Sequence, residues 1–149
     1  MMIRDMSVNE ITAMLERVEI GHIACSVSNQ PYVVPIRFVY NGGYLYALTT
    51  LGKKMEMMQL NQHVCVNFTE VKASNDWKSL VVSGSFEKIP ASDDPDSLYS
   101  FAHKVLSRSA EWWVPAYTRT ILRGDERPLE PVYFRVSVVQ TSGHATEQL

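Results

Sequence analysis

Lys53 and Lys54 follow directly after the segment Thr-Thr-Leu-Gly, where strand-forming residues give way to helix-forming ones. A helix N-terminus carries partial positive charge, so each cation in its first turn costs about 0.3 to 1 kcal/mol unless an anion neutralises it. The unpaired amides of a first turn are themselves anion donors, and Gly52 permits close approach. The pattern favours a phosphate site over two solvated lysines, with the hydroxyls of Thr49 and Thr50 as further donors.

The same segment is not a Walker P-loop. That motif requires Gly-x4-Gly-Lys-Ser/Thr, and Ala47 and Lys54 occupy its first and last positions here. No Gly-x-Ser-x-Gly elbow or Cys-His arrangement occurs, so no catalytic residue is assigned. The histidines lack the spacing of metal ligands, so no metal site is predicted and structural or surface roles are expected for His22, His63, His103 and His144.

Two further features suggest contact with a ring-shaped ligand. Pro35 lies inside an apparent strand from Tyr32 to Tyr40, where proline cannot donate to a ladder. An edge strand explains this, and so does a backbone left unpaired at Pro35, Ile36 and Arg37 to face a planar ligand. Trp113 and the tryptophan before it lie beside a proline, where one suits packing and the other a ring stack or subunit contact.

The composition excludes several classes of protein. The chain has 14 Lys and Arg against 16 Asp and Glu in 149 residues, so it lacks the basic field that holds nucleic acid. With 46% hydrophobic and 20% charged residues it is an ordinary globular chain, and residues 1–149 are predicted to form one domain. No run of about 18 apolar residues occurs, so we expect no membrane partner and a cytoplasmic location.

The order of secondary-structure signals predicts a mainly β fold. Helices are expected from about Val8 to Val18, over Leu51–Asn61 with inward methionines, and from Asp94, with Asp94 as the cap. A polar loop is expected over 71–76 and an irregular stretch over 107–130. Strands are expected over 22–27, 32–40, 44–50, 63–70, 79–89 (with Gly84 at a bulge or bend) and 131–139. The first three should be consecutive and antiparallel. These elements predict a closed or partly closed antiparallel barrel with two or three peripheral helices.

The chain from about Ile3 to Ile89 resembles a known family. The strand Pro-Tyr-Val-x-Pro, the turn Gly-Lys-Lys and the strand Ser-Leu-Val-Val-Ser-Gly occur together, and residues 131–139 match more loosely. The chain is therefore similar to the pyridoxamine 5'-phosphate oxidase-like FMN-binding split barrels, in the branch of the nitroimidazole-resistance-type flavoproteins. It lacks the family's Trp-x3-Arg-Leu-x-Pro type segment, so oxidation of pyridoxine phosphate is not expected.

The resemblance implies a six-stranded antiparallel split barrel, a homodimer, and flavin sites at the subunit interface. It implies that Lys53 and Lys54 bind the flavin phosphate with help from Thr49 and Thr50. The strand of Pro35, Ile36 and Arg37 would lie along the flavin ring. Two further contacts are implied, from Ser79 on a later strand and from Trp113 of the partner.

The expected function is that of an FMN-dependent oxidoreductase acting on a small organic acceptor. The alternative is a non-catalytic module that carries or senses a flavin or haem. FAD is the alternative nucleotide to FMN, and related split barrels bind haem or deazaflavin.

Overall fold

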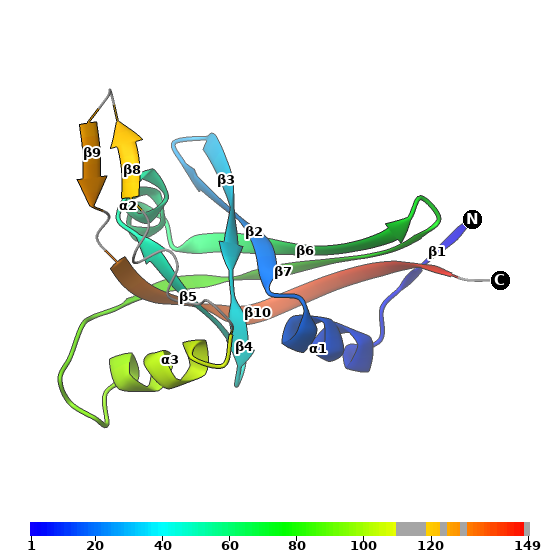
Figure 1. The fold of residues 1–149 in the computed structure, drawn as a ribbon. Helices are drawn as coiled ribbons and strands as arrows, with labels where there is room; N and C mark the ends of the chain where they lie inside the picture. The colour runs from blue at the N-terminus through cyan, green and yellow to red at the C-terminus, as the bar shows by residue number, and fades with distance from the viewer. Residues whose placement is uncertain (110–118, 123–124, 129–130, 148–149) are drawn as a thin grey trace.

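The computed structural model describes residues 1–109, 119–122, 125–128 and 131–147, and side chains are described for 1–109 and 131–147. The chain forms three helices and ten strands within these residues (Figure 1). The helices are α1 (Val8–Arg17), α2 (Lys53–Leu60) and α3 (Leu98–Leu106). The strands are β1 (Met2–Asp5), β2 (Ile20–Val27), β3 (Gln30–Arg37), β4 (Val39–Asn41), β5 (Tyr44–Thr50), β6 (His63–Ala73), β7 (Asp76–Ile89), β8 (Arg119–Leu122), β9 (Asp125–Pro128) and β10 (Pro131–Glu147). No described helix is long and apolar enough to cross a membrane.

The main sheet is rolled so that its two ends meet. Its strands follow the order β3-β2-β6-β7-β10-β5-β4, all pairs are antiparallel, and β1 adds to β10. The first and last strands of this path, β3 and β4, are joined in the chain by Phe38 alone. A flat sheet cannot place its two outermost strands one residue apart, so the sheet must curve into a barrel. The expected barrel architecture is confirmed.

Phe38 anchors the junction between β3 and β4. Its side chain is 2% exposed, and its ring packs edge-on against Phe68 and Phe134, each with a centroid 6.1 Å away. Its backbone N–H donates to the carbonyl of Glu19 at 2.7 Å. Aromatic packing and a backbone hydrogen bond thus fix the point where the barrel closes.

Tight turns join the neighbouring strands. Ser28 and Asn29, with φ of 50° and 62°, connect β2 to β3, and Gly42 and Gly43, with φ of 57° and 84°, connect β4 to β5. Two-residue loops with positive φ match the twist of antiparallel hairpins. The turn signals of the sequence therefore mark true hairpins.

Two apolar clusters lie on opposite sides of β5. Leu45 and Ala47 point into the barrel, where three buried methionines of α2 also pack, as expected. Tyr46 and Leu48 point the other way, beneath α3. Because both faces of β5 are covered, this strand is buried along nearly its whole length.

The long strands β7 and β10 bend at Gly84, where a bulge or bend was expected. Gly84 pairs with Val138 and the register then shifts by one residue, leaving Val139 as the extra residue of a bulge in β10. A Cβ on Gly84 would lie 1.7 Å from the carbonyl oxygen of Ser137. Only glycine permits this approach of the two backbones.

Several expected boundaries were wrong. The sheet has more than six strands, because 32–40 divides at Phe38 into β3 and β4, and β1 was not foreseen. The polar segment 71–76 is not a loop, since β6 and β7 continue through it to a tight turn. The stretch 107–130 contains the β8–β9 hairpin, and β10 continues beyond 139 to Glu147.

The cap of α3 was also misplaced. Ser97, not Asp94, caps the helix, and its hydroxyl accepts from the N–H of Ser100 at 3.1 Å. The Asp94 carboxylate instead accepts from the N–H of Asp96 at 2.9 Å. A short turn therefore uses the side chain that was expected to start the helix.

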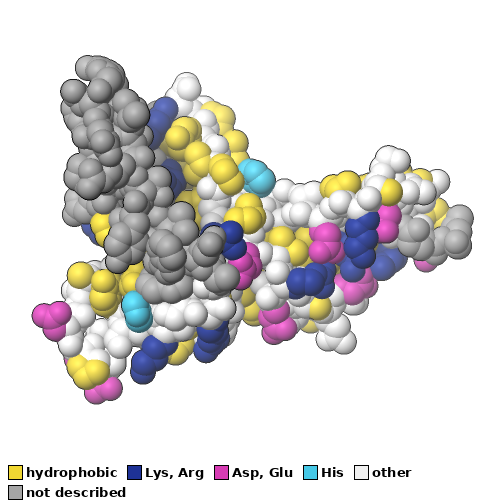
Figure 2. All heavy atoms as spheres, viewed as in Figure 1, with side chains coloured by type: hydrophobic (Ala, Val, Ile, Leu, Met, Phe, Trp, Pro, Cys, Tyr) yellow, Lys and Arg dark blue, Asp and Glu magenta, His cyan; other side chains and the backbone are white. Residues whose placement is uncertain are grey.

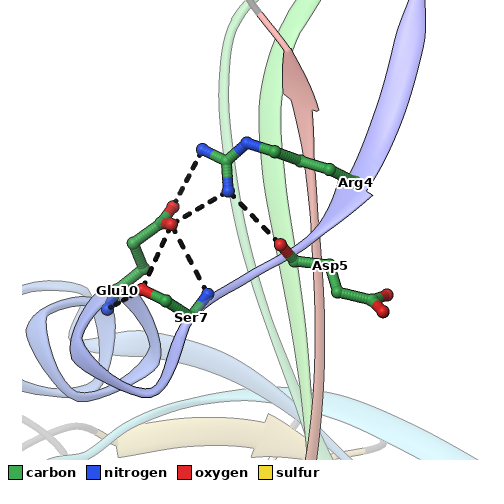
Figure 3. A network of polar contacts seen from close by, with 4 residues as sticks. All are labelled: Arg4, Asp5, Ser7 and Glu10. Atoms are coloured by element: carbon green, nitrogen blue, oxygen red, sulfur yellow. Dashed lines mark hydrogen bonds and ion pairs between the residues drawn. The ribbon is translucent and has the colours of Figure 1, made fainter.

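The start of α1 is held by a polar network (Figure 3). Ser7 and Glu10 form the expected capping box, in which each side chain satisfies the other residue's backbone N–H. Arg4 of β1 adds two hydrogen bonds to the Glu10 carboxylate, at 2.9 and 3.1 Å. These bonds from Arg4 are the main cause that lowers the pKa of Glu10 from 4.5 to about 2.

The network makes stability depend on acidity. A carboxyl group whose pKa is lower in the folded state stabilises the fold above its unfolded pKa, and this contribution disappears as the pH falls through the folded value. The advantage of wild type over Glu10→Gln should therefore be full above about pH 5 and disappear between pH 4.5 and about 2. Urea unfolding at several pH values measures the difference. Glu16→Gln is the control on the same helix, and an advantage that did not change with pH would contradict the assignment.

Candidate functional site

The start of α2 presents two cations beside an open backbone. Gly52 is the N-cap residue, with extended φ of 171°, and no side chain caps the helix. A Cβ at Gly52 would meet nothing within 4 Å. Neither Lys53 nor Lys54 belongs to an ion pair among the described residues. Within the part of the chain that the structure describes, the first-turn amides and both ammonium groups are therefore able to receive an anion.

The two lysines differ in environment. Lys54 is half-buried, and desolvation lowers its pKa. Lys53 is exposed, and its Nζ lies 5.0 Å from the ring centroid of Tyr32 on β3. No local sequence pattern connects Tyr32 to a lysine on a later helix, so Tyr32 was not predicted as a site residue.

Hydrogen bonding and packing fix α2 against the β2–β3 hairpin. Asn61, the C-cap of α2, donates from Nδ2 to the carbonyl of Ser26 on β2 at 2.9 Å. Three buried methionines, Met55, Met57 and Met58, fasten the helix to the barrel. The start of α2 and the hairpin therefore hold a fixed relation to each other.

Thr49 and Thr50 end β5, directly before α2. They pair with Val132 and Pro131 of β10, and Thr49 is buried whereas Thr50 is half-buried. Successive residues of a strand point to opposite faces. The two hydroxyls are thus adjacent in the chain without sharing a direction, and one of them at most faces a given ligand from the strand itself.

Pro35, Ile36 and Arg37 end β3, which is an outermost strand of the sheet path. The edge-strand interpretation of Pro35 therefore agrees with the structure, and one side of this backbone has no strand partner within the described sheet. Pro35 and Arg37 are exposed, whereas the Ile36 side chain is buried in the barrel. Ile36 can contact a ligand outside the barrel only through its backbone.

Arg37 is paired with an acidic residue. Its Nη1 contacts Oε2 of Glu19, the residue whose carbonyl accepts from Phe38. Glu19 thus holds both residues at the barrel junction. The carboxylate offsets the charge that Arg37 would bring to a ligand. Arg37 is five positions after Tyr32 on β3, or about 17 Å along an extended strand.

Ser79 lies on β7, which is separated in the sheet by β10 from β5, the strand that leads into α2. Its hydroxyl accepts from Nδ2 of Asn67 at 3.1 Å, and Asn67 pairs with His22, which pairs with Pro35. Ser79 is therefore linked across the strands to Pro35, not to α2. Trp113 lies outside the described residues.

Two cross-strand rows on one face of the sheet contain no Asp, Glu, Lys or Arg, and we call these rows the outer face; Arg37, two residues beyond Pro35 on β3, lies at their margin. Both rows run over β3, β2, β6, β7 and β10. The rows are Val33, Ala24, Cys65, Ser83 and Gln140, and Pro35, His22, Asn67, Val81 and Ser142. A shallow groove of about 540 Å³ follows the first row. Figure 2 shows hydrophobic side chains gathered over β2 and β3, and charged side chains of both signs toward the right of the view, over the far ends of β6, β7 and β10.

The outer face was not foreseen as a unit. Single exposed valines are ordinary on a protein surface, and Val33 and Val81 are far apart in the sequence. Only the register between strands reveals that these two valines share one surface with Pro35 and Asn67.

The chain is similar to several proteins of known structure. An FAD-binding protein from Mesorhizobium loti is 33% identical, with 99% of both chains covered and a TM-score of 0.76. A candidate 5-nitroimidazole antibiotic resistance protein from Bacteroides thetaiotaomicron is 20% identical, with coverage of 97% and 89% and a TM-score of 0.67. An FAD-binding protein from Mycobacterium smegmatis is 18% identical, with coverage of 95% and 98% and a TM-score of 0.63.

The last two relatives share the fold, whereas the Mesorhizobium loti protein is also related in sequence over its whole length. The family model of pyridoxamine 5'-phosphate oxidase matches residues 7–145, which includes every described part of the site. The resemblance seen in the motifs is confirmed, and the chain belongs to the pyridoxamine 5'-phosphate oxidase family, with the fold of its split barrels.

Proposed function

We propose that this protein binds a flavin nucleotide, with the phosphate at the start of α2 and the ring along the end of β3. The observation that carries the proposal is the pair Lys53 and Lys54 at a helix start without a side-chain cap or an ion-pair partner among the described residues. Backbone amides and ammonium groups together are the donors that a phosphate requires. Family membership supplies the ligand class.

Lys54 is the principal phosphate ligand in this proposal. Its ammonium group is partly desolvated, which lowers its pKa. The attraction between this group and a phosphate dianion is therefore stronger than it would be in bulk water. One of the hydroxyls of Thr49 and Thr50 contributes a further donor. Arg37 lies at the end of the site that would hold the flavin ring, and the Glu19 carboxylate partly offsets its positive charge there.

FMN is the nucleotide that we propose, and FAD is the alternative. The description of the Mesorhizobium loti relative as FAD-binding favours the alternative. Both nucleotides carry a phosphate on the ribityl chain, so the site at α2 suits either one. Haem and deazaflavin, which other split barrels bind, remain further alternatives that a visible spectrum of the purified protein distinguishes.

Removal of both ammonium groups should weaken flavin binding. A hydrogen bond to a charged group contributes about 1.5 to 3 kcal/mol, so Lys53→Ala/Lys54→Ala should raise the Kd for FMN at least about tenfold. Fluorescence titration with FMN measures this change. The matched control is Lys72→Ala/Lys88→Ala, which removes two exposed lysines elsewhere. An unchanged Kd in the first double variant would refute the phosphate assignment.

The bound flavin would serve as the redox group of an oxidoreductase, transferring a hydride or electrons to a small organic acceptor. The protein's part is to bind and orient the ring beside β3. The second candidate is a module that carries the flavin without turnover, since the described residues contain no constellation that demands proton transfer.

Turnover separates the two candidates. An oxidoreductase loaded with FMN should consume NADH or NADPH in the presence of a quinone or nitroaromatic acceptor, and absorbance at 340 nm follows the consumption. The Lys53→Ala/Lys54→Ala protein at subsaturating FMN is the control, and its rate should fall with its flavin content. No consumption above that of free FMN would favour the carrier.

We also propose that two copies pair through the outer face and that flavin sites lie at this interface. A two-fold interface joins the same patch of both copies, so an uncharged patch avoids the repulsion of like charges. The exposed Val33 and Val81 supply apolar area, and Pro35 and Asn67 bring the ring end of the site to the same surface. A cytoplasmic location fits this proposal and is not needed for it.

Pairing predicts a mass of twice the 16.9 kDa of one chain in light scattering at micromolar concentration. Val81→Asp places a carboxylate on the outer face of each copy, so that two such charges would be buried in the interface, and the change should shift the protein to monomers. Val8→Asp is the control. Val8 is exposed at the first position of α1, and this helix packs near Gly143 on the opposite face of the sheet, so the new carboxylate lies outside the proposed interface. A monomeric wild type, or an unchanged mass for Val81→Asp, would contradict this interface.

A further inference from the structure

Tyr32 holds Lys53 from a different element of the fold. The Lys53 Nζ lies 5.0 Å from the ring centroid of Tyr32, within the range in which an ammonium group is attracted to an aromatic face. Tyr32 is half-buried and packs against the barrel core, and its strand position opposite Cys25 fixes its backbone. The ring is therefore a rigid support for a flexible side chain.

The type of partner determines what remains of the lysine's charge. Arg37 is paired with a carboxylate, which offsets its positive charge. An aromatic ring attracts a cation through its quadrupole and carries no net charge. An ammonium group also keeps its three N–H donors available around the contact. Lys53 is thus held in place while its charge stays available to an anion.

Both partners of this contact are fixed independently of it. The Asn61 bond to Ser26 ties α2 to the strand beside Tyr32, and Ser26 pairs with Pro31, next to Tyr32 in the chain. The contact therefore costs little further ordering beyond the Lys53 side chain itself. Because the Lys53 side chain is ordered before a ligand binds, binding loses less conformational entropy, and this preorganisation improves affinity.

We infer that Tyr32 is a positioning residue of the phosphate site, holding Lys53 toward the flavin phosphate through its ring. This inference rests on the proposed flavin site and goes beyond it, since it makes phosphorylated flavins, not riboflavin, the ligands that benefit from Tyr32. The Tyr32 hydroxyl has no part in this role.

The test compares FMN with riboflavin, which lacks the phosphate. Tyr32→Leu should weaken FMN binding about two- to fivefold, as expected for loss of an exposed cation–π contact, and leave riboflavin binding unchanged. Tyr32→Phe keeps the ring and should bind both ligands as wild type does. Unchanged riboflavin binding also shows that the variants are folded.

A double-mutant cycle with Lys53→Met completes the test. If Tyr32 acts through Lys53, then Tyr32→Leu has no further effect on the Kd for FMN in the Lys53→Met background. Equal weakening of FMN and riboflavin, or full additivity with Lys53→Met, would overturn the inference and leave the phosphate site intact. A wild type that binds FMN no better than riboflavin would instead remove the phosphate site, and the inference with it.

Discussion

The closure of the barrel at Phe38 is the constraint on which the other features depend. The strand path begins with β3 and ends with β4, and one buried aromatic residue joins them. The edge-on packing of Phe38 against Phe68 and Phe134 holds both ends of the sheet to one core. Without this junction, the end of β3 would be an ordinary sheet edge with no fixed relation to β4 and β5.

The three cations of the candidate site differ in what surrounds the charged group. Arg37, next to the junction, is paired with Glu19, which also accepts the Phe38 N–H. Lys53 lies over an uncharged ring, and Lys54 is half-buried without an ion-pair partner among the described residues. Positive charge available to a ligand is therefore concentrated at α2 and reduced at the end of β3. This gradient suits an elongated ligand that is anionic at one end and planar at the other.

Local signals in the sequence predicted local structure well. The capping box of Ser7 and Glu10 and the hairpin turns before β3 and after β4 are determined by residues within a few positions of each other, so the sequence reveals them. Where two local solutions competed, the prediction failed. Asp94 and Ser97 are both good caps, and Asp94 was already satisfied by its own turn.

Features that depend on distant contacts were not predictable in the same way. The break at Phe38 falls at a residue that itself favours strands and is followed by Val39 and Tyr40, because barrel closure and not local propensity produces it. The contact of Tyr32 with Lys53 and the pairing of Arg37 with Glu19 join separate elements. The motif at residues 52–54 indicated an anion site, whereas the division of roles between its two lysines required the structure.

A crystal structure of the protein grown with FMN tests the central claim most directly. We predict electron density for the phosphate at the N-terminus of α2, within hydrogen-bonding distance of the Lys54 Nζ and the first-turn amides, with the ring extending along β3 toward Arg37. A flavin bound with its phosphate elsewhere, or an empty α2 start with both lysines directed into solvent, would contradict the account.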